Sequence, residues 1–247
     1  KQVVFVNKIT DFAYSDDGKF IAISAINNGQ SDIYVYSLAS RSLLPITNDK
    51  ADDFGPRFIE NNKRLVFSSN RRNDTIIEDK NQPYMLDKFD LFVYDFETKS
   101  KILQRLTQTI DADEKYAFDM GDDYLTFISD RNGIYNRYVG KFNYVISQID
   151  TGIHYVCRFS DFPVSDNDNG ILYQDINKNT QTIADISLYK ETYILKKEQF
   201  ASIDTLTKIP LMTTISKLYQ LAKKNIADTI NKESNYKTVK HKRLQFV

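Results

Sequence analysis

The feature that most constrains the fold of this chain is an internal repeat. A polar turn followed by a short apolar strand occurs three times. The three copies are residues 16–24, 60–68 and 121–129. Two further segments recur in the same order after the first two copies: 32–38 matches 90–96, and 45–47 matches 105–107. Ordered matches of this kind indicate a repeated structural unit.

Each unit predicts four short antiparallel strands separated by turns of Asp, Asn and Gly, which tolerate the left-handed backbone of tight hairpins. In the first unit the strands are one ending near Phe12 and then 21–24, 33–36 and 43–47. Such a unit has the size and strand content of a β-propeller blade. The units are predicted at 9–48, 52–108, 112–153 and 154–200. The predicted fold class is therefore all-β, with about four propeller blades and a C-terminal amphipathic helix.

The composition favours this fold and excludes some partners. Sixteen Tyr and sixteen Phe suit pleated, half-buried strands. The 33 basic and 33 acidic residues cancel, so no global field attracts nucleic acid, and no apolar run is long enough to span a membrane. Residues 2–6 resemble the outermost strand of a blade whose other strands are absent. We therefore expect the blades to be part of a larger ring in a longer parent protein.

The chain lacks the sequence patterns of the common catalytic and cofactor sites. It contains no Gly-x-Ser-x-Gly elbow, no His-Glu-x-x-His array and no Gly-rich phosphate loop. His154 and Cys157 are both expected on a strand, with the thiol buried as a small hydrophobe. We expect a protein that is not an enzyme and has no cofactor.

Residues 165–170, Ser-Asp-Asn-Asp-Asn-Gly, resemble a calcium-binding loop because carboxylate and amide oxygens suit a hard cation. With Gly170 at the sixth position, however, the twelfth is Ile176, where an EF-hand requires Glu. We expect a polar strand connection and no metal, with a calcium site of another kind as the weaker alternative.

Several short segments in the first three units carry a family resemblance. The WD-like repeat of TolB and related propellers is similar to three segments of the first unit: the turn 15–19, the strand 32–36 and the ending 46–49. That repeat also has a Ser-Asn-Arg or Ser-Asp-Arg step, meaning the three residues at the end of the second strand. Residues 69–71 and 129–131 match this step. The resemblance covers 1–150 well and 154–200 poorly. It implies a propeller in the periplasm or at the outer membrane of a Gram-negative bacterium. Its implied partners are envelope proteins, including an outer-membrane protein, or other domains of the same parent chain.

The loops after the second strand of two successive blades carry the candidate partner-binding residues Asn70, Arg71, Asp130 and Arg131. The two arginines could form a cationic arc for a carboxylate-bearing partner. Alternatively, they could pair with Asp32, Asp90 or Asp130 and serve the fold. Repetition across blades favours pairing.

A long insertion, residues 72–88, interrupts the second unit, and its Tyr84 and Met85 are further candidates for partner binding. Long loops in compact domains are usually functional or disordered, and both alternatives stay open.

Residues 201–247 differ in character from the blades at 1–200. Apolar residues at three- and four-residue spacings between 211 and 230 predict an amphipathic helix, which docks on the propeller flank or accepts a partner. The basic run 237–243 is expected to be a solvated linker, with an anionic-lipid or nucleic-acid contact as the weaker alternative.

Three functions follow from these features. The first is a non-catalytic, protein-binding scaffold propeller of a Gram-negative cell-envelope protein. The second is the substrate-gating propeller of a larger peptidase or hydrolase whose catalytic domain lies outside this chain. The third is a propeller that binds a sugar or another small molecule, which would show a channel lined by aromatic side chains and carboxylates.

Overall fold

The structure is a computed structural model, and it describes residues 6–77, 85–150, 152–200, 206–214, 216–218 and 222–224. The chain divides into two compact units, Lys1–Pro210 and Leu211–Val247. In the second unit the described residues 214, 216–218 and 222–224 are helical, whereas 211–213, where the helix was predicted to begin, are not. The rest of the predicted helix and the basic run lie outside the described residues. In the described part, no helix combines the length and the hydropathy needed to cross a membrane.

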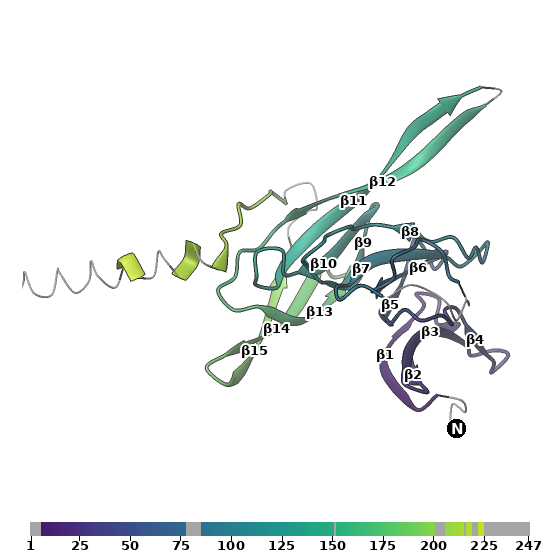
Figure 1. The fold of residues 1–247 in the computed structure, drawn as a ribbon, viewed down its shortest axis with the longest axis horizontal. Helices are drawn as coiled ribbons and strands as arrows, with labels where there is room; N and C mark the ends of the chain where they lie inside the picture. Colours follow the sequence, from purple (N-terminus) through teal and green to yellow (C-terminus); the bar gives the residue numbers. More distant parts are fainter. Residues whose placement is uncertain are drawn as a thin grey trace, which may run out of the picture. The chain divides into compact units, whose positions relative to one another are not determined.

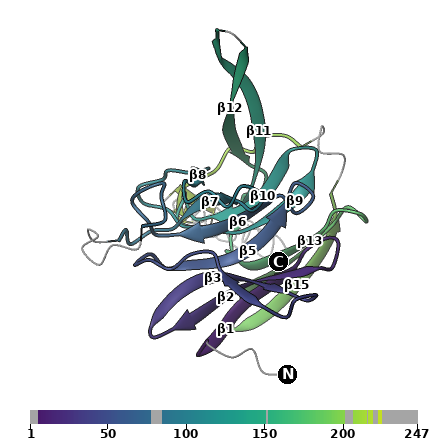
Figure 2. The ribbon, with the colours of Figure 1, turned by 90° about the vertical axis from the view of Figure 1, so that its right-hand side faces the viewer.

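The first unit is built from antiparallel sheets whose strands follow one another in chain order (Figures 1 and 2). Blade one contains β1 (Lys8–Tyr14), β2 (Phe20–Asn27), β3 (Gln30–Ser37) and β4 (Leu43–Pro45). Blade two contains β5 (Asp53–Ile59), β6 (Arg64–Ser69), β7 (Asp90–Asp95) and β8 (Gln104–Arg105). Blade three contains β9 (Glu114–Gly121), β10 (Tyr124–Ser129), β11 (Asn136–Ile149) and β12 (Ile153–Pro163). Blade four contains β13 (Ile171–Asn177), β14 (Thr182–Tyr189) and β15 (Thr192–Gln199). The predicted all-β fold of propeller blades is confirmed.

The predicted boundary between the third and fourth units is wrong. Residues 154–163 were expected to begin the fourth unit, but they belong to β12, which pairs with β11 at the edge of blade three. The described fourth sheet begins at Ile171 and has three strands. The reason is that β11 and β12 form one long hairpin, so the third unit is longer than the repeat predicted. The first-strand prediction at 2–6 lies almost wholly outside the described residues.

The turns that begin each repeat have the left-handed backbone expected from their sequences. Gly18 has a φ of 67°, Asn62 has 70° and Asp123 has 65°. In the first turn the Ser15 hydroxyl accepts the N–H groups of Lys19 and Phe20 at 3.1 and 2.9 Å. These local bonds fix the hairpin and hence the register of the strand that follows.

A recurring pair of hydrogen bonds joins the third strand of a blade to the segment that follows its outer strand. The Thr47 hydroxyl accepts the Ile33 N–H at 2.8 Å, and it lies 3.4 Å from an Asp32 carboxylate oxygen. In blade two, Thr107 makes the same two contacts with Leu91 and Asp90, at 2.8 and 3.3 Å.

Blade three repeats the arrangement with different side chains. The Ser165 hydroxyl accepts the Arg137 N–H at 2.8 Å and donates to Asn136 at 3.2 Å. The N–H of Asn167 also bonds Asn136, at 2.7 Å, as the N–H of Thr109 bonds Asp90 at 3.1 Å. The recurring Asp and Thr of blades one and two, and the Asn and Ser of blade three, thus satisfy buried polar groups at a strand end.

The blades pack face to face through apolar side chains. Between blades one and two the buried cluster includes Ile33, Val35, Phe67 and Phe92. A second cluster between blades three and four includes Met120, Val139 and Ile183. The clusters hold neighbouring sheets together by the burial of apolar surface.

The first strands of the sheets, β1, β5, β9 and β13, contact one another in succession. Arg57, on β5, lies among them and is 7% exposed. Its guanidinium contacts Asp11 of β1 at 2.8 Å and the Tyr173 hydroxyl of β13 at 3.0 Å. Its Cζ lies 4.6 Å from the centre of the Phe118 ring of β9. One side chain therefore joins all four blades.

Candidate partner-binding surfaces

Arg71, a predicted partner-binding residue, lies inside the blade-one–blade-two junction with its side chain 3% exposed. Its guanidinium contacts Asp49 at 3.0 Å and Asp53 at 2.8 Å. Its Nε donates to the Ser69 hydroxyl at 2.8 Å. Ser69 faces Asp53 across the β5–β6 pair, so strand register brings the acid, the serine and the arginine together.

Arg131 occupies the equivalent place in blade three. Its Nε lies 3.1 Å from Glu114, and its terminal nitrogens contact Asp161 of β12. Ser129, which faces Glu114 across the β9–β10 pair, donates to that carboxylate at 3.0 Å. Both arginines therefore pair with acids of the same chain, which was the alternative to a cationic arc for a partner. The acids are not the Asp32, Asp90 and Asp130 named in that alternative.

The residue before each arginine ties the second strand of the blade to the start of the first. Asn70 accepts the Asp52 N–H at 2.8 Å, and Asp130 accepts the Asp113 N–H at 2.7 Å. The Ser-Asn-Arg and Ser-Asp-Arg segments thus contribute hydrogen bonds and ion pairs to the fold. A role for these four residues in partner binding stays a prediction.

The insertion is described only at residues 72–77 and 85–88. Tyr84 lies outside the described residues, whereas Met85 is described and half-buried. The next residue, Leu86, donates its N–H to the Asn70 carbonyl at 2.9 Å, so the end of the insertion is fixed to the loop after β6. Partner binding by Tyr84 and Met85 stays a prediction.

Burial raises the pKa of three carboxyl groups in and beside these networks: Asp32, Asp53 and Glu114. Burial, together with the neighbouring carboxylates of Asp53 and Asp49, raises the pKa of Asp32 to about 7. Burial also raises the pKa of Glu114 to about 7. Asp49 and Asp53 contact the Arg71 guanidinium, and their negative charges beside Asp32 favour the protonated form of Asp32.

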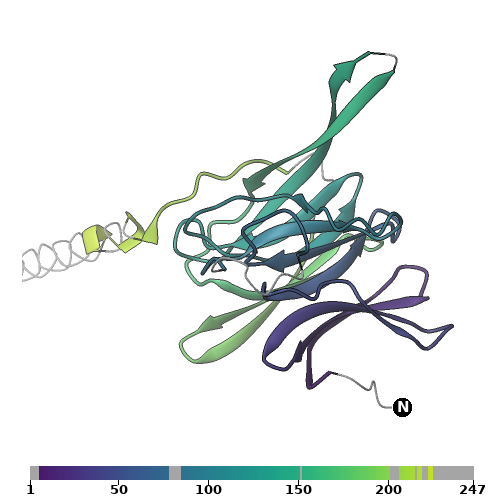
Figure 3. The same cartoon turned by 45° about the vertical axis from the view of Figure 1, so that its right-hand side comes forward.

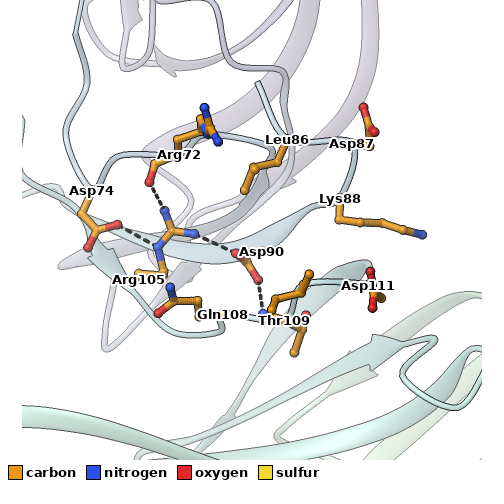
Figure 4. A pocket seen from close by; sticks show the side chains of 11 residues that line it. Arg72, Asp74, Leu86, Asp87, Lys88, Asp90, Arg105, Gln108, Thr109 and Asp111 are labelled. Carbon is orange, nitrogen blue, oxygen red and sulfur yellow. Dashed lines mark hydrogen bonds and ion pairs between the residues drawn. The ribbon is translucent and has the colours of Figure 1, made fainter. Parts of the chain in front are cut away.

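A cavity of about 630 Å³ opens beside this network on blade two. Its walls come from the loop after β6, the end of the insertion and the link between β8 and β9 (Figure 4). Arg105 forms the floor: it contacts Asp74 at 2.8 Å and Asp90 at 2.7 Å, and it donates to the carbonyls of Arg71 and Arg72.

The rim of this cavity carries charges of both signs. The Arg72 side chain is exposed, and Lys88 lies 3.6 Å from Asp113 and 3.9 Å from Asp130. Figure 4 shows Asp87 and Asp111 near Lys88 on the same side. A rim of this kind suits a polar, mixed-charge partner surface, because neither sign dominates.

The most exposed apolar surface of blade three is the hairpin of residues 142–159, here called the apolar hairpin. β11 pairs with β10 only through residues 136–141, and beyond them its described partner is β12 alone. Figure 3 shows this hairpin projecting beyond the other strands of the unit. Its exposed large apolar side chains are Tyr144, Ile146, Ile149, Ile153 and Val156.

The root of the apolar hairpin rests on blade two. Arg64 donates to the Tyr144 hydroxyl at 2.9 Å, and its Cζ lies 5.0 Å from the Phe142 ring centre. Gln104 donates to the Cys157 carbonyl at 3.4 Å. These contacts fix the root of the hairpin and leave the side chains of Ile146, Ile149, Ile153 and Val156 exposed.

The remaining chemical candidates serve local structure. His154 and Cys157 lie on β12 as expected, but the thiol is half-buried rather than buried. His154 Nε2 lies 2.9 Å from Asp150 across the hairpin turn. Ser165 and Asn167 of the calcium-like loop hydrogen-bond the start of β11, and no cluster of three or more His, Cys, Asp or Glu side chains that could hold a metal ion occurs among the described residues.

Comparison with known proteins reveals the fold and not a function. No family model and no curated protein matches the sequence. Among solved structures, TolB from Acinetobacter baumannii matches with a TM-score of 0.54 and 18% identity, over 81% of this chain and 42% of that chain. The fold is that of a TolB-like β-propeller. A chain from Agrobacterium tumefaciens assigned as TolB matches this propeller with a TM-score of 0.56 and 16% identity, over 79% and 63%.

A peptidase also contains a similar propeller. A puromycin-hydrolyzing peptidase of Mycobacterium tuberculosis matches with a TM-score of 0.52 and 11% identity, over 84% of this chain and 31% of that chain. This TolB-like propeller therefore spans less than two thirds of each of these solved chains.

The buried ion pairs of Arg71 predict a large difference between two adjacent arginines. Arg71→Met leaves Asp49 and Asp53 without their counter-charge and should lower the free energy of unfolding by about 3–5 kcal/mol. Arg72→Met, at an exposed side chain, should change it by less than about 0.5 kcal/mol. Urea unfolding followed by circular dichroism measures both, and equal effects would show that the Arg71 network does not stabilise the fold.

The raised pKa of Asp32 predicts a pH-dependent stability. Because the folded pKa is about 7 and the unfolded pKa is about 4, folding favours the protonated acid. The contribution of Asp32 to the free energy of unfolding is therefore fully present below pH 4 and is lost as the pH rises to 7. The melting temperature of the wild type should therefore fall relative to Asp32→Asn between pH 5 and pH 7.5 in calorimetry. Parallel curves for the two proteins, with exposed Glu97→Gln as the control, would contradict this prediction.

Proposed function

We propose that this chain is a non-catalytic, protein-binding scaffold module of a Gram-negative cell-envelope protein, in the periplasm or associated with the outer membrane. The observation that carries the proposal is the apolar hairpin. Ile149 is 70% exposed, Ile153 55% and Ile146 53%, all within one projecting element. Clustered apolar side chains on a soluble surface are typical of protein-binding sites.

The hairpin also offers backbone groups. β12 is the last strand of its sheet, so its outer edge has N–H and C=O groups available to a further strand. A partner that adds a strand at this edge gains backbone hydrogen bonds, and its alternate side chains meet the apolar face. The TolB-like fold supports the envelope location, and the mixed-charge rim of blade two supports a protein partner.

The proposal predicts which substitutions remove binding. Purified chain immobilised on a matrix should retain a discrete envelope protein of the host bacterium, and the purified partner should bind it in a calorimetric titration. The double variant Ile149→Ser, Ile153→Ser should weaken this binding at least about tenfold, because it removes the exposed apolar contacts.

The matched control is Tyr193→Ser, Leu195→Ser, which replaces two side chains of β15 that are 72% and 71% exposed. It should bind the partner as the wild type does. Retention of the same partner by the hairpin variant, or the absence of any retained envelope protein, would refute the proposal.

A second function is favoured by the propeller of the puromycin-hydrolyzing peptidase, which matches 84% of this chain. Here the chain would be the substrate-gating propeller of a larger peptidase or hydrolase, and another domain would supply the catalytic groups. Labelling of the full-length parent polypeptide by a fluorophosphonate serine-hydrolase probe would support this alternative over a purely scaffolding protein.

A further inference from the structure

A second cavity, of about 330 Å³, lies where the first strands of the blades meet. Every blade contributes to its lining: Phe12 and Tyr14 belong to β1, Arg57 to β5, Phe118 to β9 and Tyr173 to β13. We call it the axial pocket. Its position is independent of the apolar hairpin and of the cavity on blade two.

We propose that the axial pocket binds a neutral saccharide of one or two rings. The first observation is a pair of exposed aromatic rings. Phe12 is 58% exposed and Tyr14 is 60% exposed, although both lie on an inner strand. Their rings meet edge to face with centroids 6.4 Å apart. The C–H groups on the flat side of a sugar ring pack favourably against such rings.

The second observation is that the cations of the pocket are already paired. Lys178 contacts Asp16 at 2.6 Å and Asp119 at 2.9 Å, and Arg57 contacts Asp11 at 2.8 Å. An anionic ligand would have to compete with these carboxylates. The hydroxyl groups of a sugar need not displace these carboxylates, because a hydroxyl group can donate to a carboxylate and accept from an N–H donor at the same time.

The third observation concerns Asp175, whose side chain is exposed at the pocket. One carboxylate oxygen accepts the N–H of Ile176 at 2.8 Å, which fixes the side chain. Its other oxygen makes no hydrogen bond or ion pair with a described residue, and this bond orients it. Aromatic rings beside fixed acceptors are the combination that holds a ligand with both C–H and O–H surfaces.

The chain should therefore bind at least one of three neutral probes, maltose, cellobiose or N,N′-diacetylchitobiose, with a Kd of about 1 mM or tighter. Titration of amide chemical shifts by NMR measures the Kd and shows whether the shifted resonances belong to the pocket. Phe12→Ala and Tyr14→Ala should each weaken binding about tenfold. Tyr193→Ala, at an equally exposed ring outside the pocket lining, should leave it unchanged.

A pair of substitutions at Asp175 separates a saccharide from a cation, the other ligand that aromatic rings and a carboxylate attract. Asp175→Asn keeps an acceptor oxygen and should retain saccharide binding, whereas Asp175→Ala should weaken it. Tetramethylammonium is the cationic probe.

Binding of tetramethylammonium that is lost in Asp175→Asn, without binding of any of the saccharides, would overturn the proposal. So would the absence of pocket shifts with all three saccharides. The amide spectrum of each variant reports whether it is folded, so a loss of binding is interpretable.

Discussion

The arrangement of the blades depends on one buried guanidinium. Arg57 reaches from β5 to Asp11 of blade one, the Phe118 ring of blade three and the Tyr173 hydroxyl of blade four. A buried cation is costly unless its donors are satisfied, and here an acid, a hydroxyl and the Pro56 carbonyl accept three of its hydrogen bonds. A shift of any one inner strand relative to β5 would break one of these contacts. The shape of the axial pocket follows from this constraint.

Much of the fold was predictable because the repeat is local. The turn residues Gly18, Asn62 and Asp123 have the backbone that their types favour, and each precedes the strand expected after it. The recurring Asp and Thr are explained by one set of hydrogen bonds at a strand end. Blade three uses Asn136 and Ser165 for the same bonds, which is why its copy was hard to recognise by residue identity.

The site was less predictable because its contacts are not local. Arg57 joins residues 46 and 116 positions away, and no motif marks it. The arginines of the Ser-Asn-Arg and Ser-Asp-Arg steps were recognised, but Asp49 and Asp161 were not identified as their partners. The predicted start of blade four was wrong because the β11–β12 hairpin is long, and nothing in the repeat indicates its length. The register of the sheets and the packing of neighbouring blades bring these groups together.

The contacts of Arg57 hold the four blades together as one unit at their inner strands, and the apolar hairpin and the axial pocket remain accessible for binding. Hydrogen–deuterium exchange of the wild type and Arg57→Met tests this role of Arg57 most directly. We expect Arg57→Met to exchange faster in β1, β5, β9 and β13 together and to lose about 3 kcal/mol or more of its free energy of unfolding. Faster exchange in β5 alone, with unchanged stability, would contradict this expectation.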